Sequence, residues 1–75
     1  MSNTPGVQVG ANVRAEMARR GITQTQLAEQ IGRSQPQLSK RLTGAIPFDI
    51  NELTAVAEAL SVPIEKLTTT TAATQ

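Results

Sequence analysis

The chain has 75 residues, of which 39% are hydrophobic and 17% are charged, and its formal net charge at pH 7 is +1. A chain of this length forms one domain and buries only about 60% of the surface that its unfolded form exposes, so we expect no deep substrate cleft. Because it contains no Cys and no His, a disulfide framework, a Cys/His zinc site and catalysis by either residue type are excluded.

The composition also predicts a cytoplasmic protein. No run of 18 apolar residues occurs, so we expect no membrane span. The chain does not open with basic residues followed by an apolar run, so we expect no secretory signal. No pair of carboxylates has neighbours suited to acid–base or metal chemistry, and the sequence therefore predicts no enzyme, no cofactor, no metal site and no small-molecule substrate.

Charge is distributed unevenly along the chain. Residues 1–43 carry six basic and two acidic side chains, whereas residues 44–75 carry one basic and four acidic side chains. The first part can face a polyanion such as nucleic acid, and the second cannot. Small domains also show such asymmetry by chance, so the charge pattern alone does not identify a partner.

In chain order, residues 1–8 have no charged side chain and are predicted to form a flexible lead-in. A first helix is expected over about residues 7–20, because Val9, Val13 and Met17 recur on one face. Gly21 suits the left-handed conformation that ends a helix.

The second helix is expected over about residues 24–31. Thr23 can cap its N-terminus and Gln26 lies three residues later, which is the pattern of a capping box. Gly32 ends it. The buried stripe consists of Leu27, Ala28 and Ile31.

The third helix is expected over about residues 35–42 and repeats this pattern. Ser34 is the cap and Gln37 completes the box, while Pro36 falls in the first turn, where a missing N–H is tolerated. Leu38 and Leu42 face inward. Gly44 is expected to close the helix.

The fourth helix is expected over about residues 50–60, capped by Asp49 and Glu52, with Phe48 packing on Leu53. Its buried face is predicted to contain Ile50, Leu53, Ala57 and Leu60. A short fifth helix follows Pro63, with Ile64 and Leu67 inward. Residues 68–75 are mostly Thr and Ala and are predicted to be a disordered tail. The sequence thus predicts an all-α, compact five-helix bundle over residues 9–67.

The turn Gly32-Arg33 between the second and third helices is short enough for a helix-turn-helix, which places the start of its second helix in a DNA major groove. Gln35 and Gln37 lie at that start, with Lys40 and Arg41 one turn later. Gln can pair with adenine, and Lys or Arg with guanine. No aromatic residue lies among the basic residues, so stacking on single-stranded bases is not expected.

Residues 22–44, ITQTQLAEQIGRSQPQLSKRLTG, resemble the helix-turn-helix of the lambda-repressor-like family, which includes phage repressors, Cro proteins and many XRE-type bacterial regulators. The matching positions are Gln24, Leu27, Ala28, Gly32, Gln35, Leu38 and Gly44. Residues 47–67 are similar to the fourth and fifth helices of that family, so the resemblance covers residues 9–67.

The resemblance implies which residues touch DNA. Gln24 would brace Gln35 and contact a phosphate, and Gln35 would read an adenine. The residues expected to read bases are Gln35, Pro36, Gln37 and Lys40. The residues expected to contact phosphates are Gln24, Arg33, Ser34, Arg41 and Thr43.

The chain departs from the family pattern at two places. Where many members pair an Arg with a Glu, this chain has Met17 and Leu42, and an apolar pair can replace such an ion pair at little cost in stability. Position 41, often apolar in the family, is Arg41 here, and we hypothesise that it takes over the lost phosphate contact.

The function predicted is that of a sequence-specific double-stranded DNA-binding transcriptional regulator, a Cro-like repressor of phage or prophage type. A homodimer would place two recognition helices about 34 Å apart. Its contact surface is expected at Ile46, Pro47 and Phe48 in the loop after the third helix, and at Val62, Pro63 and the outer side of the fifth helix. The alternative is an antitoxin or accessory module that uses the same bundle to bind a protein. In that case the glutamines are capping residues on an exposed surface, and the basic residues form a solvated face.

Overall fold

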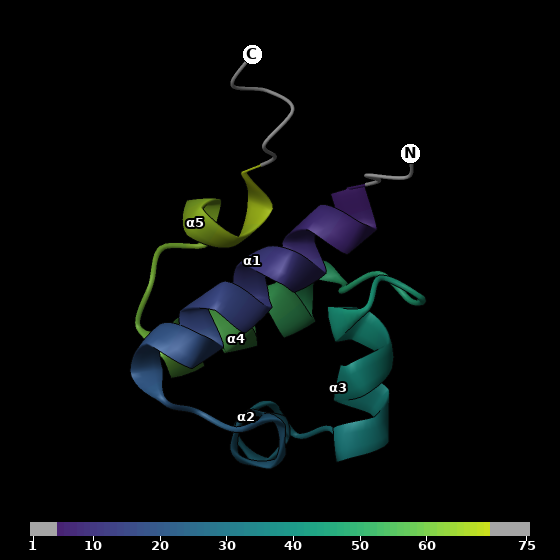
Figure 1. Cartoon of the computed structure of the whole chain (residues 1–75), viewed down its shortest axis with the longest axis vertical. Helices are drawn as coiled ribbons and strands as arrows, with labels where there is room; N and C mark the ends of the chain where they lie inside the picture. The colour runs from purple at the N-terminus through teal and green to yellow at the C-terminus, as the bar shows by residue number, and fades with distance from the viewer. Residues whose placement is uncertain (1–4, 70–75) are drawn as a thin grey trace.

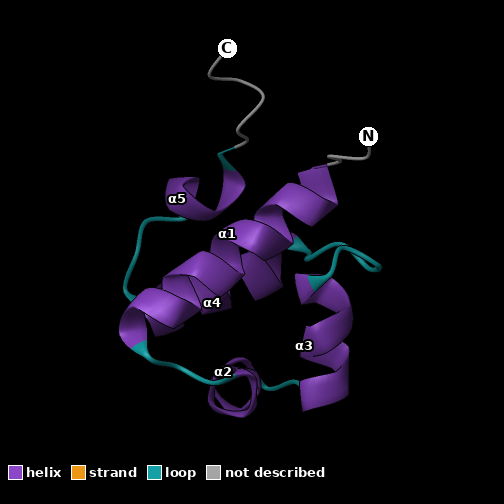
Figure 2. Ribbon diagram, in the orientation of Figure 1, coloured by secondary structure: helices purple, strands orange, loops and turns teal. Residues whose placement is uncertain are grey.

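The computed structural model describes residues 5–69, which form helices joined by short turns and loops (Figures 1 and 2). In chain order the helices are α1 (Pro5–Arg20), α2 (Gln24–Ile31), α3 (Gln35–Leu42), α4 (Ile50–Leu60) and α5 (Glu65–Thr68). The prediction of an all-α fold with five helices is confirmed. No helix within residues 5–69 combines the length and the apolar character needed to cross a lipid bilayer.

The ends of the chain differ in part from the expectation. α1 begins at Pro5, so residues 5–8 belong to a helix and not to a lead-in. Proline is tolerated there because the first helical N–H groups have no partner within the helix. The remainder of the expected lead-in, residues 1–4, and residues 70–75 of the expected tail lie outside the described residues.

Three helices begin with the capping boxes that the sequence predicts. Thr23 and Gln26 cap α2, and Ser34 and Gln37 cap α3, each pair by reciprocal hydrogen bonds between side chain and backbone. The same arrangement is present at α4. Each box satisfies two N–H groups that would otherwise lack a partner, which fixes the residue at which the helix starts.

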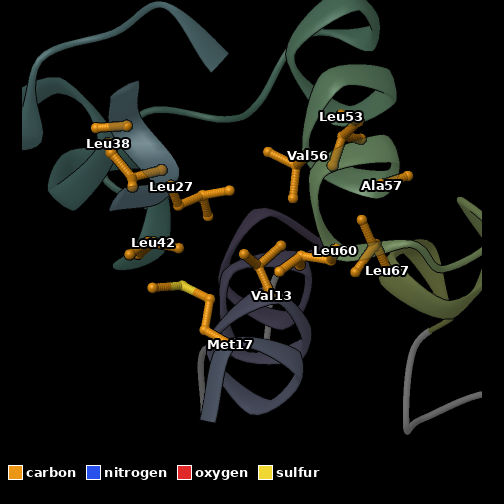
Figure 3. Packing of buried hydrophobic residues seen from close by; sticks show 11 residues of the cluster. Val13, Met17, Leu27, Leu38, Leu42, Leu53, Val56, Ala57, Leu60 and Leu67 are labelled. Atoms are coloured by element: carbon orange, nitrogen blue, oxygen red, sulfur yellow. The ribbon is translucent and has the colours of Figure 1, made fainter. Parts of the chain in front are cut away.

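The core is one cluster of buried side chains to which every helix contributes (Figure 3). α1 packs on α3, α4 and α5, and α2 packs on α3 and α4. Met17 and Leu42, which stand where many family members have an ion pair, both lie in this cluster. The buried hydrophobic residues are Val13, Met17, Leu27, Ala28, Leu38, Leu42, Leu53, Val56, Ala57, Leu60 and Leu67.

One predicted core residue is not in the core. Ile50 was expected on the buried face of α4, but 66% of its surface is exposed, whereas Val56 is fully buried. Helical side chains lean toward the N-terminus of their helix. A side chain at the first position of α4 therefore points past the end of the helix, where it has no preceding turn to cover.

Gly10 sets the position of α3 on α1. A Cβ atom at this residue would overlap the backbone carbonyl oxygen of Leu42, at the end of α3. The absence of a side chain therefore allows the two helices to approach closely at this crossing. This contact holds the C-terminal end of α3, while its N-terminal end lies at the edge of the molecule, beside the turn from α2 (Figure 1).

Candidate nucleic-acid interface

α2, the turn after it and α3 form a helix-turn-helix. In Figure 1, α2 is seen end-on while α3 runs upright in the plane of the picture, so the two helices cross steeply. Gly32 closes α2 with φ of 75°, in the left-handed region, and the backbone N–H of Arg33 donates to the carbonyl of Ala28 at 2.9 Å. Gly32 adopts this conformation without the penalty that a Cβ atom carries, which allows the chain to turn into α3 within three residues.

The N-terminal part of α3 is exposed, as the prediction of a recognition helix requires. Gln35, Pro36 and Gln37 are all exposed, and Leu38, the next residue, is fully buried. Leu38 therefore anchors the helix while the three residues before it stay free of the core. This part of α3 is accessible to a large ligand.

Gln24 braces Gln35 through the hydrogen bond that the family resemblance implies. The Gln35 side-chain Nε2 donates to Gln24 Oε1 at 2.6 Å. This contact uses one of the two amide hydrogens and leaves the other, together with Oε1, directed elsewhere. One donor and one acceptor on the same planar group match the N7 acceptor and N6 donor of adenine.

Gln37 has fewer hydrogen-bonding groups available for DNA than Gln35. Its Oε1 accepts a hydrogen bond from the Ser34 backbone N–H at 2.9 Å. While the capping box is intact, the side chain therefore offers chiefly its Nε2 hydrogens. A group that only donates fits acceptors such as guanine O6 and N7 or thymine O4, and it does not reproduce the adenine pattern.

The remaining groups at the start of α3 offer few donors to a phosphate. The Gln37 N–H donates to Ser34 Oγ at 3.2 Å, and Pro36 has no N–H. Because Ser34 Oγ accepts this bond, its own hydroxyl hydrogen is still available for an anion. The Ser34 side chain could therefore contact a phosphate without giving up its role as a cap.

At the other end of α3, Lys40 and Thr43 differ in what they can offer. Lys40 is exposed, and within residues 5–69 its ammonium group forms no ion pair. The Thr43 hydroxyl donates to the Lys40 carbonyl at 3.1 Å, and its backbone N–H donates to the Ser39 carbonyl at 3.1 Å. Thr43 can therefore reach a phosphate as a donor only if its hydroxyl rotates away from Lys40.

Arg33 and Arg41 share a partner that the sequence interpretation did not assign to them. Their Nε atoms donate to the same oxygen, Glu52 Oε2, at 2.8 and 2.9 Å respectively. The Glu52 side chain is only 4% exposed. Arg41, proposed from sequence as a phosphate ligand, thus directs part of its guanidinium group toward the protein interior.

The ionisation of Glu52 reflects these contacts. Burial acts most strongly on this carboxyl and by itself would raise its pKa, but the backbone N–H of Asp49 and the two guanidinium groups together outweigh it and lower the pKa. The hydrogen bond and the charge of Glu52 in turn raise the pKa of Arg33. Glu52 is therefore a charged residue held within the fold by three donors.

The capping role of Glu52 was predicted, but its contacts with the arginines were not. The box Asp49–Glu52 is visible in the sequence because it is local. Arg33 and Arg41 precede Glu52 by 19 and 11 residues, and only the packing of α4 on α2 brings these positions together.

Within residues 5–69, no group of three or more potential metal ligands lies close enough together to hold an ion.

Comparison with known proteins agrees with this geometry. Residues 8–69 match a family model described as a helix-turn-helix domain. The clp gene regulator ClgR from Corynebacterium glutamicum has the same fold, with a TM-score of 0.83 and 26% identity over 88% of this chain and 86% of its own. No sequence among the curated proteins matches this chain significantly.

Two further solved structures are similar. The restriction-modification controller protein C.AhdI from Aeromonas hydrophila is 21% identical with a TM-score of 0.77, over 81% of this chain and 92% of its own. PlcR from Bacillus thuringiensis, solved with the peptide PapR7 and DNA, is 30% identical with a TM-score of 0.73 over 81% of this chain and 21% of its own. The chain belongs to the helix-turn-helix domain family, and its fold is that of the lambda-repressor-like, XRE-type transcriptional regulators.

Proposed function

We propose that the protein is a sequence-specific double-stranded DNA-binding regulator that reads the major groove with α3. The observation that carries this proposal is the exposed start of α3, where Gln24 holds the Gln35 amide with one donor and one acceptor unused. The family membership supports it, and so does PlcR, a structural relative that was solved with DNA. The proposal makes the protein a cytosolic binding module and not an enzyme.

The proposed contacts assign different tasks to the residues of α3. Gln35 pairs with an adenine, Pro36 makes apolar contact with a thymine methyl group, and Gln37 and Lys40 donate to guanine or thymine acceptors. Ser34 and Gln24 contact phosphates through groups that remain available after capping and bracing. Thr43 contributes a phosphate contact if its hydroxyl rotates.

We further propose that the protein acts as a dimer and as a repressor of the phage type. One recognition helix covers only a few base pairs, and two helices about 34 Å apart would read a longer, pseudo-palindromic site. Of the apolar residues considered from sequence, Ile46, Pro47 and Pro63 are exposed, whereas Phe48 and Val62 are partly buried against the core. Ile46 and Ile50, which lies four residues later in the chain and is also exposed, are the residues that we assign to the contact with the partner subunit.

A selection of bound duplexes from a random pool tests the proposal. We expect an enriched site with two related half-sites, and sedimentation on that site should give two protein chains per duplex. Affinity should fall steeply with salt, because each phosphate that the protein neutralises releases counterions. A reporter gene carrying the site should be repressed when the protein is expressed.

A matched pair of variants separates base reading from general attraction to DNA. Gln35→Ala should weaken binding to the selected site by roughly 1–3 kcal/mol and leave binding to unrelated duplexes unchanged. Gln30→Ala, on the exposed side of α2, is the control and should change neither. A protein that enriches no sequence and shows no salt dependence would instead be an accessory module that binds proteins.

A further inference from the structure

The carboxylate of Glu52 links α4 to the segment formed by the turn and α3. Its Oε1 accepts from the Asp49 backbone N–H at 2.9 Å, and its Oε2 accepts from Arg33 in the turn and from Arg41 in α3. α3 packs mainly on α1 and α2. Through Arg33 and Arg41, Glu52 therefore connects both ends of the turn–α3 segment to α4. These hydrogen bonds add to the packing of α3 on α1 and α2.

The two arginines differ in how firmly they are held. The Arg41 side chain is 17% exposed and also donates from Nη1 to the Gln37 carbonyl at 2.9 Å. The Arg33 side chain is 37% exposed, and its Nη1 has only a long contact of 3.5 Å with the Gly32 carbonyl. The terminal nitrogens of Arg33 are therefore closer to solvent and more weakly engaged than those of Arg41.

We propose that Glu52 is a positioning residue that divides the two arginines between two tasks. Arg41 stays on Glu52 and fixes α3, while Arg33 presents its terminal nitrogens to a phosphate of the DNA backbone. This inference rests on the proposed function, because it concerns how the same surface contacts DNA. It keeps the phosphate contact that the resemblance implies for Arg33 and withdraws the one expected of Arg41.

The geometry lets Arg33 reach a phosphate without leaving Glu52. Its Nε stays on Glu52 Oε2 at 2.8 Å, and its two terminal nitrogens remain available to the DNA. Glu52 therefore keeps all three donors when DNA binds, whereas a buried carboxylate left without donors would be strongly destabilising. Arg33 also directly precedes Ser34, whose hydroxyl hydrogen is available, and a planar guanidinium group binds phosphate with two parallel hydrogen bonds.

The slope of affinity against salt distinguishes the two arginines. The probe is a fluorescein-labelled 30-base-pair duplex of random sequence, followed by anisotropy between 50 and 200 mM NaCl. Arg33→Ala should reduce the log–log slope by about 0.9, the value for one phosphate contact, and lower the melting temperature of the free protein less than Arg41→Ala does. Arg41→Ala should lower the melting temperature and leave the slope unchanged.

The control for the lost charge is Lys66→Ala, in α5 and exposed, which should alter neither the slope nor the melting temperature. Because Arg41→Ala can unfold the domain, Arg33→Ala alone decides the outcome. An unchanged slope for Arg33→Ala, with wild-type binding that depends on salt, overturns the inference and leaves the proposed function intact. Wild-type protein without salt-dependent binding overturns both.

A second measurement tests the positioning role itself. Glu52→Gln preserves the capping box, because Gln can fill the same position, but it removes the charge that orients Arg33. In the Glu52→Gln background, Arg33→Ala should cost less DNA affinity than in the wild type, whereas Lys40→Ala should cost the same in both. Equal costs for Arg33→Ala in the two backgrounds overturn the role of Glu52.

Discussion

α2 and α3 have nearly the same local design, and their differences explain why we assign the reading of DNA to only one of them. Both are eight residues long, and both begin with a hydroxyl cap and a glutamine three residues later. The residue after each box is a fully buried leucine, Leu27 or Leu38. Where α2 has Glu29 and Gln30, α3 has Lys40 and Arg41, so the same scaffold carries opposite charge.

The capping boxes fix where both helices start. Their different charges and packing neighbours determine which of them is available to a ligand. α2 packs on α3 and α4, whereas α3 packs on α1 and α2 and leaves its first turn exposed. Gln24 and Gln35 occupy the same position in their helices, yet they are hydrogen-bonded to each other. Gln24 thus holds the side-chain amide of Gln35 in place.

The largest effect is expected from removing the two matched core leucines. Leu27→Ala and Leu38→Ala each delete a fully buried side chain, and each should lower the free energy of unfolding by about 2–5 kcal/mol. Urea denaturation followed by circular dichroism measures this loss. Ile50→Ala, at an exposed position, is the control with little expected change; a loss confined to one leucine would contradict the equivalence of the two helices.

Glu52→Gln should remove the ion pairs with Arg33 and Arg41, which hold the turn and α3 and have no counterpart within α2. We expect the free energy of unfolding at pH 7 to fall by about 3 kcal/mol, the lower end for removing one partner of a buried pair, because both arginines can still reach water. The substituted amide would still complete the capping box, so the loss of stability reports on the charge of Glu52.

The pH dependence of that loss has a defined sign. The folded protein lowers the pKa of Glu52, so its contribution to stability is fully present above the unfolded pKa, about 4.3, and is lost as the pH falls through the lower folded value. The difference between wild type and Glu52→Gln should therefore be constant from pH 6 to 8 and shrink below about pH 4. An equal difference at pH 3 and pH 7 would rule out a role for the charge.

The caps provide a smaller and more symmetrical test. Thr23→Ala and Ser34→Ala each remove an oxygen that accepts a backbone N–H, and each should cost about 1 kcal/mol in thermal or urea unfolding. Only Ser34→Ala should also weaken binding to DNA in the anisotropy assay, because only Ser34 lies at the start of α3, the proposed recognition helix. Equal losses of DNA affinity would mean that the effect comes from stability alone.

The smallest change in stability is expected from the charged positions that distinguish the two helices. Lys40→Ala and Glu29→Ala alter exposed residues and should shift the free energy of unfolding by no more than about 0.5 kcal/mol. Their effects on DNA affinity should differ: Lys40→Ala weakens binding at low salt, and Glu29→Ala leaves it unchanged or strengthens it. Two variants with the same effect would show that the charge difference between α2 and α3 does not matter.

The sequence determined the helices and their capping boxes because these features depend on residues within one or two turns of each other. Gln26, Gln37 and Glu52 each follow their cap by three residues, and the periodic leucines identify the buried faces. The glutamines at the start of α3 could also be identified as candidate site residues, since the helix-turn-helix spacing is local.

The tertiary structure decided how the polar groups are shared. It alone turns Arg41 inward and gives Arg33 and Arg41 one common oxygen on Glu52. These outcomes depend on where separate helices meet, and a side chain has a limited number of donors and acceptors to divide among its neighbours. The sequence pattern of a single helix or turn therefore does not predict which neighbours share these donors and acceptors.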